Sequence, residues 1–203
     1  MSILHAIGIF LLYKRFHVIM KEGNYMERIK KIKVNFEDMS ATPFFQVQTN
    51  YRIRFGTESI ENNLKLLREI LGEIFKENDR IDVSFISGYI AYDKSKRTYE
   101  KTRIGKFVEI QNWKETQITD DDLENTVIFT TIKGVHKDEV YKYCKYVVNG
   151  GQQAYISFYN DTYLLYINSD VIDIISADAS LIEKLKIHYS EEYDKFYEIE
   201  ELE

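Results

Sequence analysis

The segment 152–176, QQAYISFYNDTYLLYINSDVIDIIS, decides the fold of this chain. It contains three short runs rich in β-branched and aromatic residues, at 154–159, 162–167 and 171–176. Asn and Asp residues separate these runs at 160–161 and 168–170, where their side chains favour tight turns. Connections this short join antiparallel neighbours. The segment therefore predicts a three-stranded meander.

The rest of the chain alternates between helical and strand patterns. We predict strands at 51–56, 81–92 and 126–136, and helices at 26–38, 60–74, 137–148 and 180–196. Residues 104–113 fit either a short helix or a strand, and 93–103 fit a charged loop. Because this order lacks regular βαβ repetition, it predicts an α+β fold, with a mainly antiparallel mixed sheet and helices packed on it.

Capping and burial patterns give finer expectations. Ser59 is expected to cap the helix at 60–74, and Ser180 with Glu183 forms a predicted capping box for the last helix. That helix is expected to turn four side chains inward: Ile182, Leu185, Tyr189 and Phe196. In the strand at 81–92, polar residues are expected to point away from the core.

Composition indicates a folded protein with an acidic surface. The 203 residues are 44% hydrophobic and 30% charged, and no Pro-rich or Gly-rich linker divides them, so we expect one domain over 26–203. The net charge of −6 disfavours binding to nucleic acid or to an anionic membrane and favours a basic partner. The single cysteine, Cys144, is expected to be a buried apolar residue in a reducing cytoplasm.

The first 25 residues raise a question about the start of translation. The apolar run at 3–13 is much shorter than the roughly 20 residues of a membrane span, and basic residues follow it rather than precede it. The codons for residues 21–23 can spell a purine-rich ribosome-binding site just before Met26. We therefore expect translation to start at Met26. Otherwise, residues 1–25 add an extra apolar segment to the domain.

Common catalytic motifs are absent from the sequence. It has no GxSxG, HExxH, CxxC, P-loop or GxGxxG pattern, so the enzyme classes that need those spacings are not indicated, and we predict no catalytic residue and no cofactor. An unfamiliar site could still draw on five residues: Arg54, Asp82, His136, Asp173 and His188. For Arg54 the preferred interpretation is a structural brace with Asp173, and His136 is expected to bond near a helix start.

Two charged clusters have structural interpretations. The acidic stretch 119–125, TDDDLEN, lacks the alternating ligands and the glycine of a calcium loop, so we predict no metal site. Its carboxylates suit the first turn of a short helix instead. The basic residues within 93–103 are interpreted as solvated charges rather than as a phosphate site.

The meander is rich in tyrosine, which suits protein recognition. Tyr155 and Tyr159 share one strand face with Ser157, and no Lys or Arg occurs between Lys145 and Lys184, which disfavours a nucleic-acid platform. These tyrosines could equally be boundary residues of a covered sheet. The predicted binding residues are Tyr155, Tyr159, Asp161, Tyr163, Asp170 and Asp173.

Three segments resemble a bacterial family known as domain of unknown function 3885: IRFG (53–56), EIFKENDRI (73–81) and YLLYINSDVIDIISADASLIEKLKIHYSEEYDKF (163–196). The family usually carries an acidic pair followed by Arg-Gly in the final hairpin, where this chain has Asn168, Ser169 and Asp170. The resemblance implies an α+β fold, a cytosolic bacterial protein and no established activity. Family members are similar to immunity proteins encoded near secreted toxins.

Two functions are therefore compatible with the sequence. The leading hypothesis is a non-enzymatic cytoplasmic protein that binds a basic protein partner, in the manner of a toxin-neutralising immunity protein. The alternative is a small hydrolase or transferase that uses Arg54, His136 and an aspartate.

Overall fold

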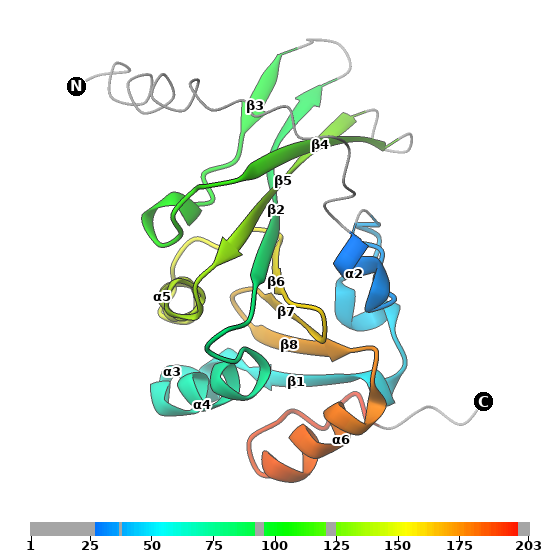
Figure 1. Ribbon diagram of the computed structural model, residues 1–203, viewed down its shortest axis with the longest axis vertical. Helices are drawn as coiled ribbons and strands as arrows, with labels where there is room; N and C mark the ends of the chain where they lie inside the picture. The colour runs from blue at the N-terminus through cyan, green and yellow to red at the C-terminus, as the bar shows by residue number, and fades with distance from the viewer. Residues whose placement is uncertain (1–26, 37, 92–95, 121–124, 199–203) are drawn as a thin grey trace.

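The computed structural model describes residues 27–36, 38–91, 96–120 and 125–198. Within these ranges eight strands form one sheet, and every strand pair is antiparallel. With the helices packed on this sheet, the predicted α+β fold is confirmed (Figure 1). Residues 1–25 and the predicted start at Met26 lie outside the described ranges.

The sheet joins two strand groups that are distant in sequence. The strand order is β1-β8-β7-β6-β2-β5-β4. Strand β3 lies outside this order and pairs with β2. The strands are β1 Arg52–Gly56, β2 Ile81–Ala91, β3 Arg97–Tyr99, β4 Trp113–Asp120, β5 Asn125–Val135, β6 Ile156–Tyr159, β7 Tyr163–Ile167 and β8 Val171–Ser176. The predicted meander is β6-β7-β8, and the early strand β1 closes its outer edge by pairing with β8.

The two faces of the sheet have different covers. The helices are α2 Glu27–Lys31, α3 Thr57–Glu61, α4 Leu64–Ile74, α5 Lys137–Val148 and α6 Ala179–His188. Helices α3 to α6 pack on what we call the first face, where they share the larger apolar cluster with the strands. The second face is covered by α2 and the segment that follows it, so α2 lies opposite α3, α4 and α5 in Figure 1.

The predicted helix at 60–74 is broken into α3 and α4. Asn63 caps α4, since its side-chain oxygen accepts a hydrogen bond from Leu66 N at 3.3 Å. Ser59 lies inside α3 and is not the N-cap. The predicted helix at 26–38 is also too long, because Lys33 has a φ of 63° and the chain leaves the helix after Lys31.

The last helix also begins and ends differently from the prediction. Asp178 is its N-cap and accepts a hydrogen bond from Ser180 N at 2.9 Å, so the box of Ser180 and Glu183 was wrong. Ile182, Leu185 and Tyr189 are buried as predicted. Phe196 is 78% exposed, because the helix ends at His188 and the remaining chain does not continue its apolar stripe.

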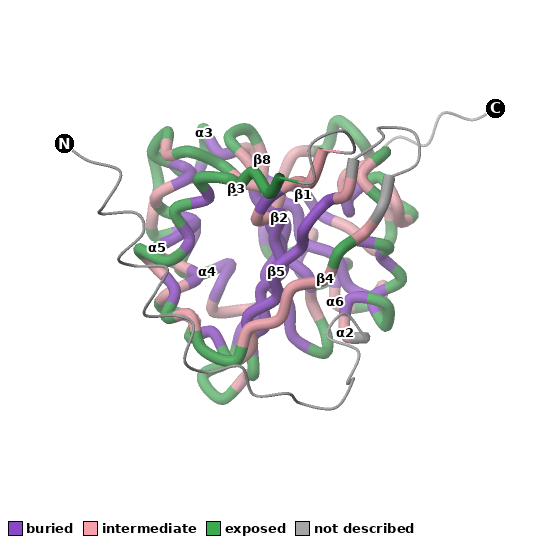
Figure 2. Tube along the Cα trace, turned by 90° about the horizontal axis from the view of Figure 1, so that it is seen from above, coloured by how far each residue is buried: buried purple, intermediate pink, exposed green. Residues whose placement is uncertain are grey.

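Strand β2 is buried on both faces, which corrects the expected polarity of residues 81–92. Asp82 and Ser84 are buried because β5 and β6 flank the strand and both faces are covered. Figure 2 shows β2 and β5 as the buried centre of the molecule and β3 as exposed. The undecided residues 104–113 form a single 3₁₀ turn, Ile104–Lys106, before β4 begins at Trp113.

The acidic stretch 119–125 forms strand ends rather than a helix start. Thr119 pairs with Thr126 and Asp120 pairs with Asn125 in the β4–β5 ladder. The expected helix was wrong because the local preference of acidic residues for a helix start is weaker than the pairing of two long strands. Residues 121–124 lie outside the described ranges.

Candidate functional site

Arg54 and Asp173 form the brace that the sequence predicts. They lie directly opposite each other on β1 and β8, with Arg54 Nε 2.6 Å from Asp173 Oδ1 and Nη2 2.9 Å from Oδ2. The Arg54 guanidinium also lies 3.9 Å from the centre of the Phe44 ring. Burial raises the pKa of the Asp173 carboxyl, and the bidentate arginine opposes that shift. Asp173 is fully buried, so it does not present its charge to a partner.

This ion pair ends a row of polar side chains across the second face. In register from β1 to β5 the row comprises Arg54, Asp173, Tyr166, Ser157, Ser84 and Thr131. Ser84 Oγ is 2.7 Å from Thr131 Oγ1 and 2.9 Å from the Tyr159 hydroxyl. The Ser157 hydroxyl is buried and has no hydrogen-bond partner among the described residues. The centre of the second face is therefore polar beneath its cover.

Apart from the Arg54–Asp173 pair, the candidate catalytic residues do not come together. Arg54 lies on β1 and His136 follows β5, so five interstrand steps, roughly 24 Å along the sheet, separate them. His136 is exposed, and its backbone N–H donates to Glu139 Oε2 at 2.8 Å at the start of α5. His188 is also exposed, with Nδ1 3.9 Å from Glu73 Oε1. These residues form no shared site.

Asp82 is held by structural contacts at the lower end of β2. One carboxylate oxygen is 3.4 Å from Arg28 Nη1, and the other accepts a hydrogen bond from Gly134 N at 3.2 Å. Burial raises the pKa of Asp82, and Arg28, Gly134 and Arg80 oppose the rise. Since Arg28 also reaches Arg80 O at 2.9 Å, this cluster fastens α2 to the sheet.

The predicted tyrosine surface is divided between the two faces. Tyr155 and Tyr159 lie on the second face, whereas Tyr163 packs against the apolar cluster of the first. Tyr159 is fully buried and cannot contact a partner in this conformation. Side chains alternate between the faces of a strand, so Tyr155 and Tyr159, which are four residues apart, lie on the same face. After the β6–β7 turn, Leu164 pairs with Tyr159, and Tyr163 therefore points to the opposite face.

The two exposed aspartates have separate surroundings. Asp161 Oδ1 is 3.2 Å from Arg28 Nε and 3.9 Å from Lys31 Nζ, so its charge is already paired within the chain. Asp170 stays exposed in the turn between β7 and β8, where Asn168 Oδ1 accepts hydrogen bonds from the backbone N–H groups of Asp170 and Val171. Of the predicted acidic binding residues, Asp170 alone is both exposed and outside an ion pair.

A pocket of about 350 Å³ opens on the second face near the junction of β2 and β3. Three tyrosines line it, Tyr89, Tyr155 and Tyr166, together with Glu100. The remaining lining residues are Ile86, Thr102, Gln153, Ala154 and Asn168. Only Tyr155 among them belongs to the predicted binding residues.

A bulge in β2 builds one wall of this pocket. The pairing register shifts between Ile86 and Gly88, so Ile86 opposes Phe129 while Tyr89 opposes Val127 on the same face. In a regular strand, residues three apart point to opposite faces. The bulge therefore brings both Ile86 and Tyr89 to the pocket.

Gly88 allows β3 to form the next wall. A Cβ atom on Gly88 would lie 2.4 Å from Thr98 O, so a side chain there would push β3 away. Beyond β3, Glu100 N donates a hydrogen bond to Ser87 O at 2.9 Å. The close approach thus fixes the position of Glu100 at the rim.

Aromatic contacts hold the remaining wall. The ring of Tyr155 stacks on Phe36 with centroids 4.7 Å apart and meets Tyr166 edge-on at 5.6 Å. Burial raises the pKa of Tyr89, and the nearby Glu100 carboxylate raises it further. Burial also raises the pKa of Tyr155 and Tyr166. All three phenols are neutral at physiological pH, so Glu100 gives the pocket its charge.

The sequence offered one signal for this site that our predictions did not use. A glycine inside a strand pattern indicates a bulge or a close backbone approach, and Gly88 is both. Glu100 lay within the segment predicted as a solvated basic loop, and Tyr166 was seen only as part of the meander. The residues near Glu100 and Tyr166 in the sequence do not indicate that both line one pocket. The lining of that pocket comes from four separate segments of the chain.

The described part of the chain contains no cluster of three or more His, Cys, Asp or Glu side chains suited to a metal ion. In the same ranges, none of the helices combines the length and the apolar character needed to cross a membrane. Comparison with protein-family models, with curated proteins and with solved structures gave no match to this chain. The resemblance to the bacterial family therefore stays a prediction.

Proposed function

We propose that this protein is a non-enzymatic binding protein whose partner is a basic protein. The observation that carries the proposal is the open pocket that is lined by three tyrosines and by Glu100. Tyrosine gives rigid contact area at low entropic cost and keeps a hydroxyl for hydrogen bonding. Such a site suits recognition and contains no nucleophile paired with a base.

The charge of the whole chain supports the same class of partner. A net charge of −6 attracts a basic protein at long range and raises its association rate at low salt. The exposed Asp170 lies in the turn next to the pocket residue Asn168 and adds to this attraction. The finer form of the proposal is a cytoplasmic immunity protein that neutralises a toxin, which is what the family resemblance implies.

The test is a binding titration with the purified polypeptide encoded by the adjacent gene. We expect a stoichiometric complex whose association rate falls as salt increases, and protection of cells that express this polypeptide. A polypeptide that neither binds nor is neutralised would contradict the immunity role. A complex that forms without protection would support binding alone.

The alternative of a hydrolase or transferase is less well supported, because the residues proposed for it lie apart. Arg54 is engaged with Asp173, and His136 lies on the surface five strands away. No specific contact in the described ranges favours a reaction at either place.

A further inference from the structure

We infer that the tyrosine pocket is the receptor for one arginine side chain of the protein partner. The inference rests on the proposed function and deepens it, because it assigns the chemistry of the contact. The guanidinium would lie against the tyrosine rings and pair with the carboxylate of Glu100.

The charge of the lining residues selects a cation. Glu100 is exposed at the rim, and its carboxylate makes no hydrogen bond or ion pair with any described residue. The lining contains no Lys, Arg or His that could neutralise this carboxylate or bind an anion. A free carboxylate beside neutral aromatic rings attracts a cation by ion pairing and by the negative face of each ring.

The geometry favours arginine over lysine. A guanidinium is planar, stacks on aromatic rings and presents paired N–H donors to a carboxylate, whereas an ammonium is a compact and strongly hydrated charge. The side chain of Gln153 supplies an oxygen acceptor on the same lining. Its Oε1 atom accepts one hydrogen bond, from Ser169 N, and retains capacity for a second, whereas Asn168 Oδ1 already accepts two.

The chain already holds one arginine in the arrangement that we propose. Arg54 pairs with the Asp173 carboxylate through two hydrogen bonds while its guanidinium lies 3.9 Å from the Phe44 ring centre and 5.0 Å from that of Tyr197. The pocket offers the same elements, a carboxylate and aromatic faces, without an arginine of the described chain among them.

The size and rigidity of the pocket suit a single side chain. Its volume of about 350 Å³ is near the lower end of the range for ligand pockets. Phe36 supports Tyr155 from behind, and Tyr155 O accepts a hydrogen bond from Ile86 N at 3.0 Å. A wall held in this way needs little ordering when the side chain enters.

The experiment uses the full chain and three small probes. N-acetyl-arginine methylamide, its lysine analogue and its uncharged citrulline analogue are titrated while amide NMR shifts are followed. We expect the arginine probe to bind most tightly, the lysine probe more weakly and the citrulline probe weakest, with shifts centred on Tyr89, Tyr155 and Asn168. Equal affinity for arginine and citrulline, or shifts centred elsewhere, would overturn the inference.

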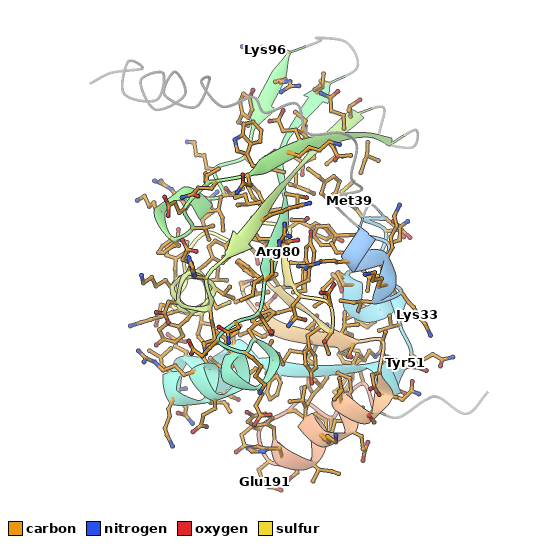
Figure 3. All side chains as sticks on the ribbon, viewed as in Figure 1. Lys33, Met39, Tyr51, Arg80, Lys96 and Glu191 are labelled. Atoms are coloured by element: carbon orange, nitrogen blue, oxygen red, sulfur yellow. The ribbon has the colours of Figure 1, made fainter. Side chains whose placement is uncertain are left out.

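Glu100→Gln tests the carboxylate, and Glu191→Gln is its matched control. Both glutamates are exposed, and Glu191 lies at the opposite end of the molecule from Lys96, which immediately precedes β3 (Figure 3). Loss of a charge-assisted contact should weaken arginine binding by about tenfold in Glu100→Gln. Glu191→Gln should bind like the wild type. Thermal unfolding of both variants checks that the fold is intact.

Binding of the protein partner separates this inference from the proposed function. If the partner binds wild type and Glu100→Gln equally, the arginine receptor is wrong while the binding function stands. If the arginine probe depends on Glu100 but no basic protein binds, the pocket chemistry holds and the proposed function is wrong. Tighter binding of a nucleotide than of the arginine probe would also overturn the inference.

Discussion

The two faces of the sheet use the same strands for different purposes. The first face has a large apolar cluster and is covered by four helices whose side chains share that cluster. The second face has a polar row at its centre, a short helix and irregular chain as its cover, and the pocket at its upper end. Neighbouring residues of a strand therefore pack under helices on one side and under a short helix and irregular chain on the other.

The covers explain this difference. An amphipathic helix presents a continuous apolar stripe, which excludes water from a sheet face along its length. Helix α2 has five residues, and the chain after it is held by single buried side chains such as Val34, Phe36 and Phe44. A cover of this kind leaves room for polar groups and for a pocket, and we expect the faces to respond differently to mutation.

Alkaline pH should have the largest effect, because it acts on buried tyrosines of both faces. Burial raises the pKa of Tyr189 on the first face to about 12, and it also raises the pKa of Tyr155 on the second. The folded state thus holds protons that the unfolded chain releases near pH 10. Stability is complete below pH 10 and falls as the pH rises toward 12, so we expect cooperative unfolding in this window. Circular dichroism and tyrosinate absorbance should change together.

The variants Tyr189→Phe and Tyr155→Phe compare the faces in this transition. Neither hydroxyl has a hydrogen-bond partner among the described residues, so each change removes an ionisable group at little cost. Both variants should unfold at higher pH than the wild type. An unchanged midpoint for either one would show that its hydroxyl does not titrate with unfolding.

Asp173→Ala should give the largest loss of stability at neutral pH. It leaves the Arg54 guanidinium buried without its carboxylate, which typically costs about 3–5 kcal/mol. Urea denaturation measures the change. The control is the double variant Arg54→Met with Asp173→Leu, which should recover most of the lost stability because apolar residues replace the buried pair. A single variant as stable as the double one would contradict a strong brace.

Ile174→Ala and Ile175→Ala test the two faces at adjacent positions of β8. Both side chains are fully buried, with Ile174 in the cluster of the first face and Ile175 in that of the second. We expect a cost in the free energy of unfolding of about 4 kcal/mol for Ile174→Ala and about 2 kcal/mol for Ile175→Ala. The same atoms are removed in both, but the irregular chain that covers the second face can shift into the space left by Ile175. Urea denaturation of both variants is the measurement, and equal costs would remove the proposed difference.

Gly88→Ala should have a smaller effect on stability and a specific effect on the pocket. The added Cβ would meet Thr98 O at 2.4 Å, so we expect a loss of about 1–3 kcal/mol and weaker binding of the arginine probe. Gly72→Ala is the matched control, because it lies within α4 with no atom within 4 Å of its added Cβ. That control should gain up to about 1 kcal/mol and bind normally. Normal binding by Gly88→Ala would show that β3 does not shape the pocket.

Local patterns of the sequence were sufficient for much of the fold. The meander, the helix at 137–148 and the buried Cys144 follow from residue period, Asx turns and a glycine-rich helix end. The Arg54–Asp173 pair also followed, since two charged residues on short apolar strands need a partner when buried. The cap at Asn63 did not, because Ser59 and Asn63 are equally good caps and packing decides where the helix breaks.

Strands β3 and β4 were not predicted from the sequence, and β3 lies in the segment 93–103 that was expected to be a charged loop. The sequence by itself determined the other six described strands, most of the helices and the charge that favours a basic partner. These depend on neighbours within a few residues, whose backbone preferences and side-chain spacing act locally. The tertiary structure alone decided that Tyr163 leaves the face of Tyr155 and that Glu100 lines one pocket with Tyr89 and Tyr166. Those contacts depend on the β2 bulge and on which strands pair, and pairing energy comes from residues far apart in the chain.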